Sequence, residues 1–311
     1  MPRLADRLRG GVLGLLIGDA LGVPYEFHRA ADIPAWAHIE MEPPPGFPRS
    51  HSGTPPGTWS DDGAQALCLL ASLLDRGRLD IDDLGRRLLR WYHEGYLAAD
   101  GRVFDVGVTT GSALSRLAAG VPAIEAGDSD HYSQGNGSLM RALPLALWHR
   151  GTDAELAGDA DRQSRVTHGH PSCRVACALY CLWARGLMED RPSAWSHAVE
   201  TLRALLPSDG PERHALEWTL RVDDAGPGTG SGFVADSLRS VRALLAHDTY
   251  EAVVRAAVAL GQDTDTTAAV AGGLAGLRDG VHGIPERWVA GLRSRELAHE
   301  LVEMLVRYRL A

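Results

Sequence analysis

The chain has 311 residues, of which 45% are hydrophobic and 23% are charged, as is typical of a folded globular protein. A net charge of −9 argues against a protein that binds nucleic acid through a broad basic face, although it is compatible with a small basic pocket. No apolar run is long enough to cross a bilayer, so a membrane protein is not expected.

Helical periodicity runs through most of the chain. The first apolar stretch, residues 3–22, is expected to form a core helix rather than a signal peptide, because Gly14 interrupts it and Asp19 follows at once. Apolar residues at helical spacing predict further helices over 66–77, 80–96, 109–120, 136–150, 173–189, 193–207, 236–247, 249–261 and 294–310. Period-two alternation is nearly absent, and no repeat or long linker divides the chain. The sequence therefore predicts an all-α fold in a single domain spanning 1–311.

The cysteines indicate neither a disulfide framework nor a common metal site. Cys173, Cys177 and Cys181 recur at every fourth position and would share one face of a helix. This spacing matches no common zinc or iron–sulfur pattern, so small buried side chains are favoured over a metal site. With Cys68 isolated, a reducing cytoplasmic location is expected. No coiled-coil heptads occur, and a monomer is expected.

Two clusters of carboxylates and hydroxyls precede apolar helical segments: Ser60, Asp61 and Asp62 in one, Asp263, Asp265 and Thr266 in the other. Helix capping explains either cluster alone, since these side chains accept hydrogen bonds from the first helical turn. Two such helix starts, far apart in the sequence, can also converge in space. Their oxygens would then neutralise two divalent cations that share and activate a water. The repetition favours a site for Mg²⁺ or Mn²⁺ over capping alone.

Polar and glycine-rich segments stand at other helix starts: Asp105, Thr109, Thr110 and Gly111 in one, Gly135, Asn136, Gly137 and Ser138 in the other. Free N–H groups without bulky side chains form a phosphate cradle, whereas a tight turn that requires glycine is the alternative. His168 is placed to reach a ligand, although a lone histidine is more often structural. The Pro/Gly-rich segment 30–58 either covers a site, as long ordered loops often do, or is a mobile surface excursion.

Seven motifs together carry a family resemblance: GLLIGDALGVPYEF, GTWSDDGAQAL, GRVFDVGVTTGSAL, QGNGSLMRALPLAL, VTHGHP, GTGSGFVADSL and GQDTDTTAAVAGGLAG. In type and order they resemble those of the ADP-ribosylglycohydrolase family, which includes the dinitrogenase-reductase-activating glycohydrolases. The resemblance runs from about Leu8 to Gly276. The pairing of S-D-D with D-x-D-T at this separation is specific, whereas the glycine segments alone are not.

The resemblance implies an all-α enzyme that holds two Mg²⁺ or Mn²⁺ ions at the base of a cleft. Such an enzyme cleaves the bond between ADP-ribose and an acceptor, most often a protein arginine side chain, with serine as a further possibility. The metal ligands implied by the motifs are Ser60, where the family more often has Thr, with Asp61, Asp62, Asp263, Asp265 and Thr266. The catalytic residues implied are Glu26, Asp61, Asp62, Asp105 and Asp265, with either Glu26 or Asp105 transferring the proton.

The resemblance also implies a set of substrate-binding residues. Loops around the diphosphate and distal ribose would comprise Thr109, Thr110, Gly111, Gly135, Asn136, Gly137 and Ser138. His168 resembles a histidine close to the ligand. Phe233 stands where the family often has a Tyr that stacks on adenine; Phe keeps the stacking face and lacks the hydroxyl.

Two other functions use the same residues. A non-catalytic ADP-ribose-binding or immunity protein on the same fold is one alternative, and a Mg²⁺-dependent hydrolase of phosphate esters is another. A pure binding protein does not need four metal-side carboxylates together with Glu26, so the complete set favours an enzyme.

Overall fold

The computed structural model describes residues 2–224 and 226–311. This part of the chain contains α-helices, short helical turns and isolated β-bridges but no named strand, which confirms the predicted all-α class. The α-helices are α1 Leu4–Gly22, α2 Asp61–Arg76, α3 Ile81–Glu94, α4 Val108–Ala118, α5 Ala123–Ala126, α6 Leu143–Trp148, α7 Asp153–Arg165, α8 Pro171–Met188, α9 Ala194–Leu205, α10 Pro211–His214, α11 Val234–Leu244, α12 Tyr250–Ala259, α13 Thr264–Asp279, α14 Glu286–Gly291 and α15 Arg295–Leu310.

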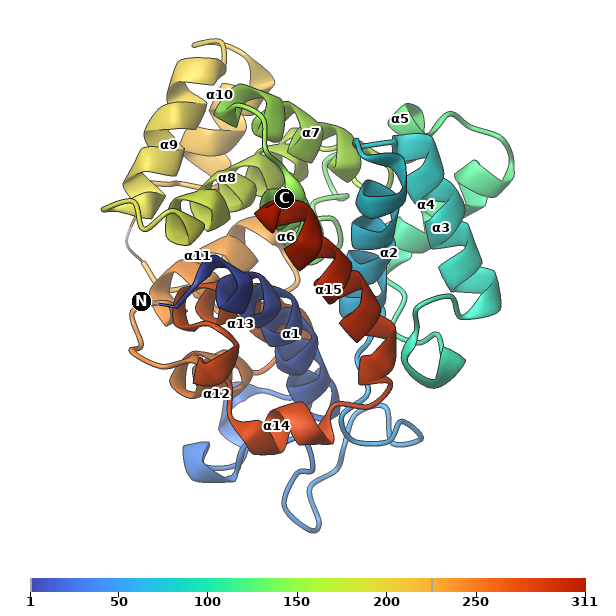
Figure 1. Ribbon diagram of the computed structural model, residues 1–311, viewed down its shortest axis with the longest axis vertical. Helices are drawn as coiled ribbons and strands as arrows, with labels where there is room; N and C mark the ends of the chain where they lie inside the picture. The colour runs from blue at the N-terminus through green and yellow to red at the C-terminus, as the bar shows by residue number, and fades with distance from the viewer. Residues whose placement is uncertain (1, 225) are drawn as a thin grey trace.

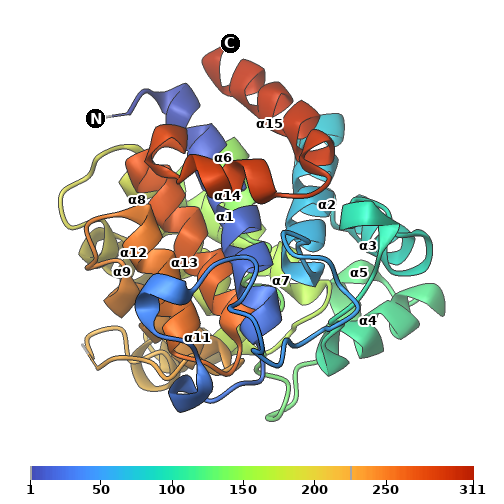
Figure 2. The same cartoon turned by 90° about the horizontal axis from the view of Figure 1, so that it is seen from below.

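The first helix and one of the last form the centre of the molecule. Helices α1 and α13 lie side by side and make the most extensive contact between any two elements (Figures 1 and 2). Helices α8 and α12 also pack against α13, and α15 packs against α1. Both central helices are buried on nearly all sides, which explains why they are rich in Ala and Gly and lack a polar face.

A row of glycines lets these two backbones touch. Gly10, Gly14, Gly18 and Gly22 recur at every fourth position of α1, so they share one face. A Cβ added at Gly18 would lie 2.1 Å from the carbonyl oxygen of Ala268, and one at Gly22 would lie 2.4 Å from that of Thr264. No real side chain fits at these distances. The row therefore fixes α13, and the acidic residues at its start, against the end of α1.

One helix is shorter than the sequence predicts. The prediction of a helix over 136–150 is wrong for its first half, because 136–142 forms turns and α6 begins only at Leu143. Pro144 has no N–H to donate to the carbonyl of residue 140, which prevents a continuous helix across this point. The side chains of Asn136 and Arg141 instead make hydrogen bonds to distant segments.

The polar helix α7 was absent from the predicted set. Its start is fixed by a reciprocal capping box in which Thr152 and Glu155 hydrogen-bond each other's backbone N–H groups. The loop 30–58 contains only two short 3₁₀ turns, Ala30–Asp32 and Trp36–His38. Across the described residues, every helix lacks the combination of length and apolarity needed to cross a membrane.

Candidate active site

The start of α2 is capped by a carboxylate from α1. Asp19 accepts hydrogen bonds from the backbone N–H of Ser60 at 2.9 Å and of Gly63 at 2.8 Å. The Ser60 hydroxyl accepts a further one from the N–H of Asp62 at 3.3 Å. These contacts use three N–H groups at the start of α2, and neither the carboxylate of Asp61 nor that of Asp62 accepts any of them. Capping therefore falls to Asp19 and Ser60 and does not account for the two following carboxylates.

The acidic starts of α2 and α13 meet, as the paired motifs predict. The Thr266 hydroxyl donates to Oδ2 of Asp62 at 3.2 Å, although the two residues are 204 positions apart. Carboxylate oxygens of Glu26, Asp263 and Asp265 lie within 4.8 Å of one another. Asp263 also accepts a 2.7 Å hydrogen bond from the side-chain amide of Asn136. Three separate chain segments thus bring oxygen atoms together, and a fourth supplies the amide donor.

Two of these carboxylates have an oxygen without a partner in the described part of the chain. Asp62 Oδ1 and Asp265 Oδ2 are fully buried, and neither has a hydrogen-bond partner among the described residues. Burial, and then repulsion from neighbouring carboxylates, raises the pKa of Asp61, Asp62 and Asp265 well above its usual value. Buried carboxylates of this kind are stable when they are paired or bind a cation. An all-oxygen donor set fits Mg²⁺ or Mn²⁺ and not a thiolate-bound metal.

A cavity of about 660 Å³ opens above these carboxylates. The motif residues that line it are Glu26, Asp61, Asp105, Thr109, Thr110, Gly135, Asn136, Gly137, His168, Asp263 and Thr266. Ser60, Asp62 and Asp265 lie buried outside this lining. Three further motif residues are also outside the lining. Gly111 lies in the first turns of α4, and Ser138 is buried with its hydroxyl 2.8 Å from that of Ser164. Phe233 immediately precedes α11 and forms a β-bridge with Gly135.

The glycine segment packs closely against His168. A Cβ at Gly137 would lie 2.8 Å from Cε1 of this histidine, so glycine permits the approach. The imidazole is buried, and burial lowers its pKa to about 3, which keeps the ring neutral. Nδ1 lies 2.8 Å from the Thr167 hydroxyl. The ring is thereby fixed as an uncharged polar group on the cavity wall.

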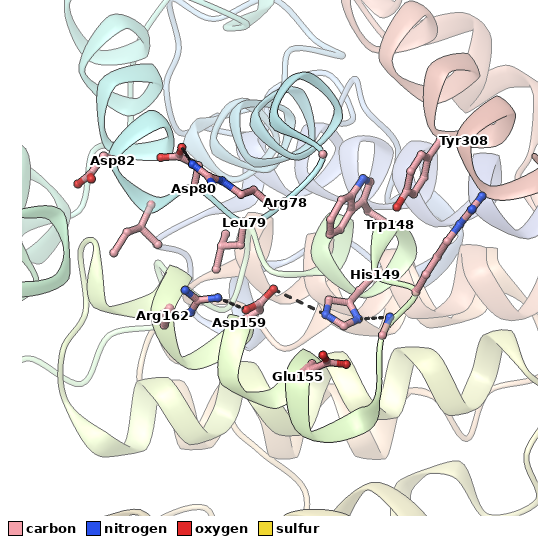
Figure 3. A pocket seen from close by; sticks show the side chains of 14 residues that line it. Arg78, Leu79, Asp80, Asp82, Trp148, His149, Glu155, Asp159, Arg162 and Tyr308 are labelled. Atoms are coloured by element: carbon pink, nitrogen blue, oxygen red, sulfur yellow. Dashed lines mark hydrogen bonds and ion pairs between the residues drawn. The ribbon is translucent and has the colours of Figure 1, made fainter.

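A second cavity of about 640 Å³ differs in its charges (Figure 3). It lies between the start of α3, the end of α6, α7 and α15, and several of its acids face a basic partner. Asp159 pairs with Arg162 and lies 3.7 Å from His149, while Asp80 pairs with Arg78 at 3.1 Å. The two cavities therefore cannot be distinguished by volume. They differ in charge, because buried carboxylate oxygens without a hydrogen-bond partner among the residues described occur at the first.

The model of the ADP-ribosylglycohydrolase family matches residues 1–310. The chain belongs to the ADP-ribosylglycohydrolase family. It is 32% identical over 306 residues to the ADP-ribosylarginine hydrolase Tri1 of Serratia proteamaculans, covering 96% of this chain and 79% of that protein. It is 30% identical over 311 residues to the ADP-ribosyl-[dinitrogen reductase] glycohydrolase of Rhodospirillum rubrum, covering 98% and 97%. A solved structure described as an ADP-ribosylglycohydrolase-related protein complex matches with a TM-score of 0.77 at 35% identity over 99% of both chains.

Several contacts that support this ADP-ribosylglycohydrolase site were not predicted from the sequence. Gln65 donates to Oδ2 of Asp61 at 3.0 Å, and the buried guanidinium of Arg141 donates to Gln65 at 2.9 Å. Gln65 lies one helical turn after Asp61, a spacing that indicates such a contact. Asp19 lies in a helix whose other residues are mostly apolar or glycine, so its polarity was the available signal. His51 lies in the loop 30–58, where no local pattern points to the site.

Proposed function

We propose that this protein hydrolyses the glycosidic bond between ADP-ribose and an acceptor, with a protein arginine side chain as the favoured acceptor and serine as the alternative. The observation that carries the proposal is the meeting of the acidic starts of α2 and α13, marked by the 3.2 Å hydrogen bond between Thr266 and Asp62. Unpartnered oxygens of Asp62 and Asp265 beneath the cavity add to it. The names of the relatives from Serratia proteamaculans and Rhodospirillum rubrum support the same bond type.

Two divalent cations, Mg²⁺ or Mn²⁺, fit the donor set as cofactors. The residues that would hold them are Ser60, Asp61, Asp62, Asp263, Asp265 and Thr266. When bound, such ions orient ribose hydroxyls and lower the pKa of a water. The chain's own contribution is to bury these oxygens and to hold Asp61 and Asp263 in place through Gln65 and Asn136.

Hydrolysis requires a proton to move as the bond to the acceptor breaks. A water oxygen adds to the anomeric carbon of the ribose, and the departing acceptor atom gains a proton. Positive charge develops on the ribose in the transition state, and the carboxylates around it stabilise that charge. We assign proton transfer to Glu26, because its carboxylate is buried beside Asp263 and Asp265 and lines the cavity. Asp105, in the segment before α4, also lines the cavity and would face the ribose from there.

The diphosphate would bind where backbone N–H groups point into the cavity. Helix α4 begins without a side-chain cap, and Val108, Thr109 and Thr110 of its first turn line the cavity. Uncapped N–H groups at a helix start favour a phosphate. The segment Gly135–Gly137, with the neutral His168 beside it, supplies a second polar wall.

The cavity rim suits a guanidinium acceptor. The phenyl ring of Phe27 is 71% exposed and lines the cavity next to the carboxylates of Glu26 and Asp105. A planar guanidinium stacks on aromatic rings and pairs with carboxylates. A serine acceptor uses neither interaction. These features support arginine over serine.

A panel of substrates tests the proposal. Peptides carrying ADP-ribosyl-arginine or ADP-ribosyl-serine, and p-nitrophenyl phosphate, would be incubated with the protein and Mg²⁺ or Mn²⁺ and followed by mass spectrometry or absorbance. We expect release of ADP-ribose, fastest from arginine, and loss of that release in Asp61→Asn and Asp263→Asn. Cleavage of the phosphate ester alone would contradict the proposal. Binding of ADP-ribose without turnover of either peptide would favour a binding protein.

A further inference from the structure

The carboxylate of Glu26 is held by a residue from a different chain segment. Nε2 of His51 lies 2.6 Å from Oε2 of Glu26. No other side chain within the described residues makes a hydrogen bond to this carboxylate. The same Nε2 lies 3.9 Å from Oδ1 of Asp105. One imidazole therefore stands between the two acids that the motifs present as candidates for proton transfer.

The loop that carries His51 is attached to both acidic segments. Ser50 donates its backbone N–H to the carbonyl of Pro24 at 3.0 Å and its hydroxyl to the carbonyl of Glu26. On the other side, the ring of Phe104, which precedes Asp105, lies 5.1 Å from the imidazole. The Phe27 ring lies 5.8 Å from it on the Glu26 side. The imidazole is thus packed between the neighbours of the two acids.

Backbone conformation at this point is unusual for residues other than glycine. Phe27, His51 and Asp105 have φ values of 63°, 49° and 57°. Left-handed backbone of this kind costs free energy and persists where surrounding contacts impose it. Three such residues, from three segments, meet around one carboxylate. Because three residues from three segments share this conformation, we attribute it to packing around the site and not to the local geometry of one turn.

We infer that His51 is a positioning residue that holds the Glu26 carboxylate at the cavity wall and fixes its distance from Asp105. Oε2 is occupied by the imidazole, so Oε1 is the oxygen left to exchange a proton with substrate or water. The inference rests on the proposed hydrolase function and assigns a role to a residue outside every motif that indicated that function. His51 acts through Glu26 and does not itself contact the reacting atoms.

Substitution of His51 tests this role. Asparagine tolerates left-handed backbone but is too short to reach Glu26, whereas glutamine restores an N–H donor at similar reach. In His51→Asn we expect kcat to fall about 10–100-fold, the range typical of residues that orient a functional group, with KM changed by less than about 3-fold. His51→Gln should recover part of the loss. His38→Asn, at an exposed histidine of the same loop, is the matched control and should keep wild-type kcat.

A double-mutant cycle separates positioning from a general structural effect. If His51 acts through Glu26, His51→Asn should change kcat by less than about 2-fold in a Glu26→Gln background. Melting temperature and Mn²⁺ affinity by calorimetry should stay near wild type in His51→Asn and His51→Gln. Wild-type kcat in His51→Asn, or the same loss in both backgrounds, would overturn the inference and leave the hydrolase function standing. A wild-type protein inactive on every ADP-ribosyl substrate would overturn both.

Discussion

Two buried aspartates show how differently a carboxylate can be held in this protein. Burial alone would raise the pKa of Asp236, but hydrogen bonds from the backbone and hydroxyls of Ser231 and Thr229 outweigh it and lower that pKa. Asp265 has one oxygen hydrogen-bonded to the N–H of Thr266 and the other without a partner among the described residues, and its pKa is raised. Asp236 thus fixes the loop before α11, whereas Asp265 keeps one buried oxygen free, within the described residues, for a further partner.

Phe27 gives a test of acceptor choice. In Phe27→Ala the guanidinium would lose a stacking surface worth about 0.5–2 kcal/mol, so kcat/KM for the ADP-ribosyl-arginine peptide should fall about 2–30-fold. The value for the serine peptide should change little. Trp218→Ala serves as the control, because this ring is 73% exposed but does not line the cavity. An equal fall for both peptides would show that Phe27 supports the loop and not the acceptor.

Sequence patterns identified the residues with a local signature. Asp61 and Asp263 each stand at the start of a buried helix, and the repetition of this pattern indicates a shared site. His51 and Asp19 act on partners in other segments: His51 on Glu26 and Asp105, Asp19 on the start of α2. Contacts of that kind depend on how loops and helices cross, and no spacing rule along one segment reveals them.

The position of each acidic cluster depends on the elements beneath it. Helix α13 carries Asp265 in its first turn, and Gly22 at the end of α1 touches that turn. The short turn after α1 leads to Glu26. The backbone N–H of Phe27 donates to the carbonyl of Gln262 at 2.6 Å, and that of Gln262 donates to the carbonyl of His28 at 2.6 Å. Glu26 and Asp265 are therefore held by the same pair of helices.

Adding a methyl group between these helices should disturb the site. Gly18→Ala would place a Cβ 2.1 Å from the Ala268 carbonyl, so α1 and α13 must separate. We expect the free energy of unfolding to fall by about 1–3 kcal/mol or more, and Mn²⁺ affinity to fall with it. Urea denaturation and calorimetry measure the two effects.

Gly158→Ala is the matched control for that substitution. Gly158 lies in α7 with no atom within 4 Å of an added Cβ, and alanine there should stabilise the protein by about 0.5–1 kcal/mol. Equal stability of the two variants would mean that the central helices are not in rigid contact.

Helices with an apolar stripe can be predicted from the sequence more readily than polar helices whose main signal is a capping motif. Helix α3, with Leu84, Leu88 and Trp91 buried, follows the periodicity closely. Helix α7 is polar on much of its surface and was missed, because its capping box and not its hydrophobic pattern defines it. Helix α6 was predicted too long, because the effect of Pro144 was outweighed by the apolar run around it.

The whole molecule concentrates unbalanced negative charge at its centre, and this makes stability depend on pH when no metal is bound. Burial raises the pKa of Asp19 to about 7 and that of Glu26 to about 8, above the values near 4 expected in an unfolded chain. The folded state then binds more protons than the unfolded state up to about pH 8. The free energy of unfolding must therefore decrease as pH rises through this range.

The prediction is sharpest between pH 6.5 and 8. Below about pH 6.5 the buried, neutral His168 contributes with the opposite sign, since its pKa is lowered. In EDTA we expect the free energy of unfolding to decrease from pH 6.5 to 8 by about 1.4 kcal/mol per pH unit for each extra proton bound, and the melting temperature to fall with it. Saturating Mn²⁺ should restore stability at pH 8, by about 2.7 kcal/mol at 100 times Kd.

Variants identify the source of that pH dependence. Asp265→Asn removes one buried charge, so it should reduce the slope in EDTA and abolish the stabilisation by Mn²⁺. Asp32→Asn, at a surface carboxylate paired with Arg29, should change neither. A melting temperature in EDTA that is constant or rises over this range would show that the carboxylates are balanced by groups of the protein itself.

The contact between the starts of α2 and α13 joins residues that leave the ribosome at very different times. Asp62 emerges about 200 residues before Asp265, which corresponds to roughly 10–40 s at about 5–20 residues per second. During this interval the early carboxylates remain hydrated, because the surface that will bury them has not yet been synthesised. On the proposed function, a cation held between these two clusters would therefore bind at the last stage of synthesis or after it.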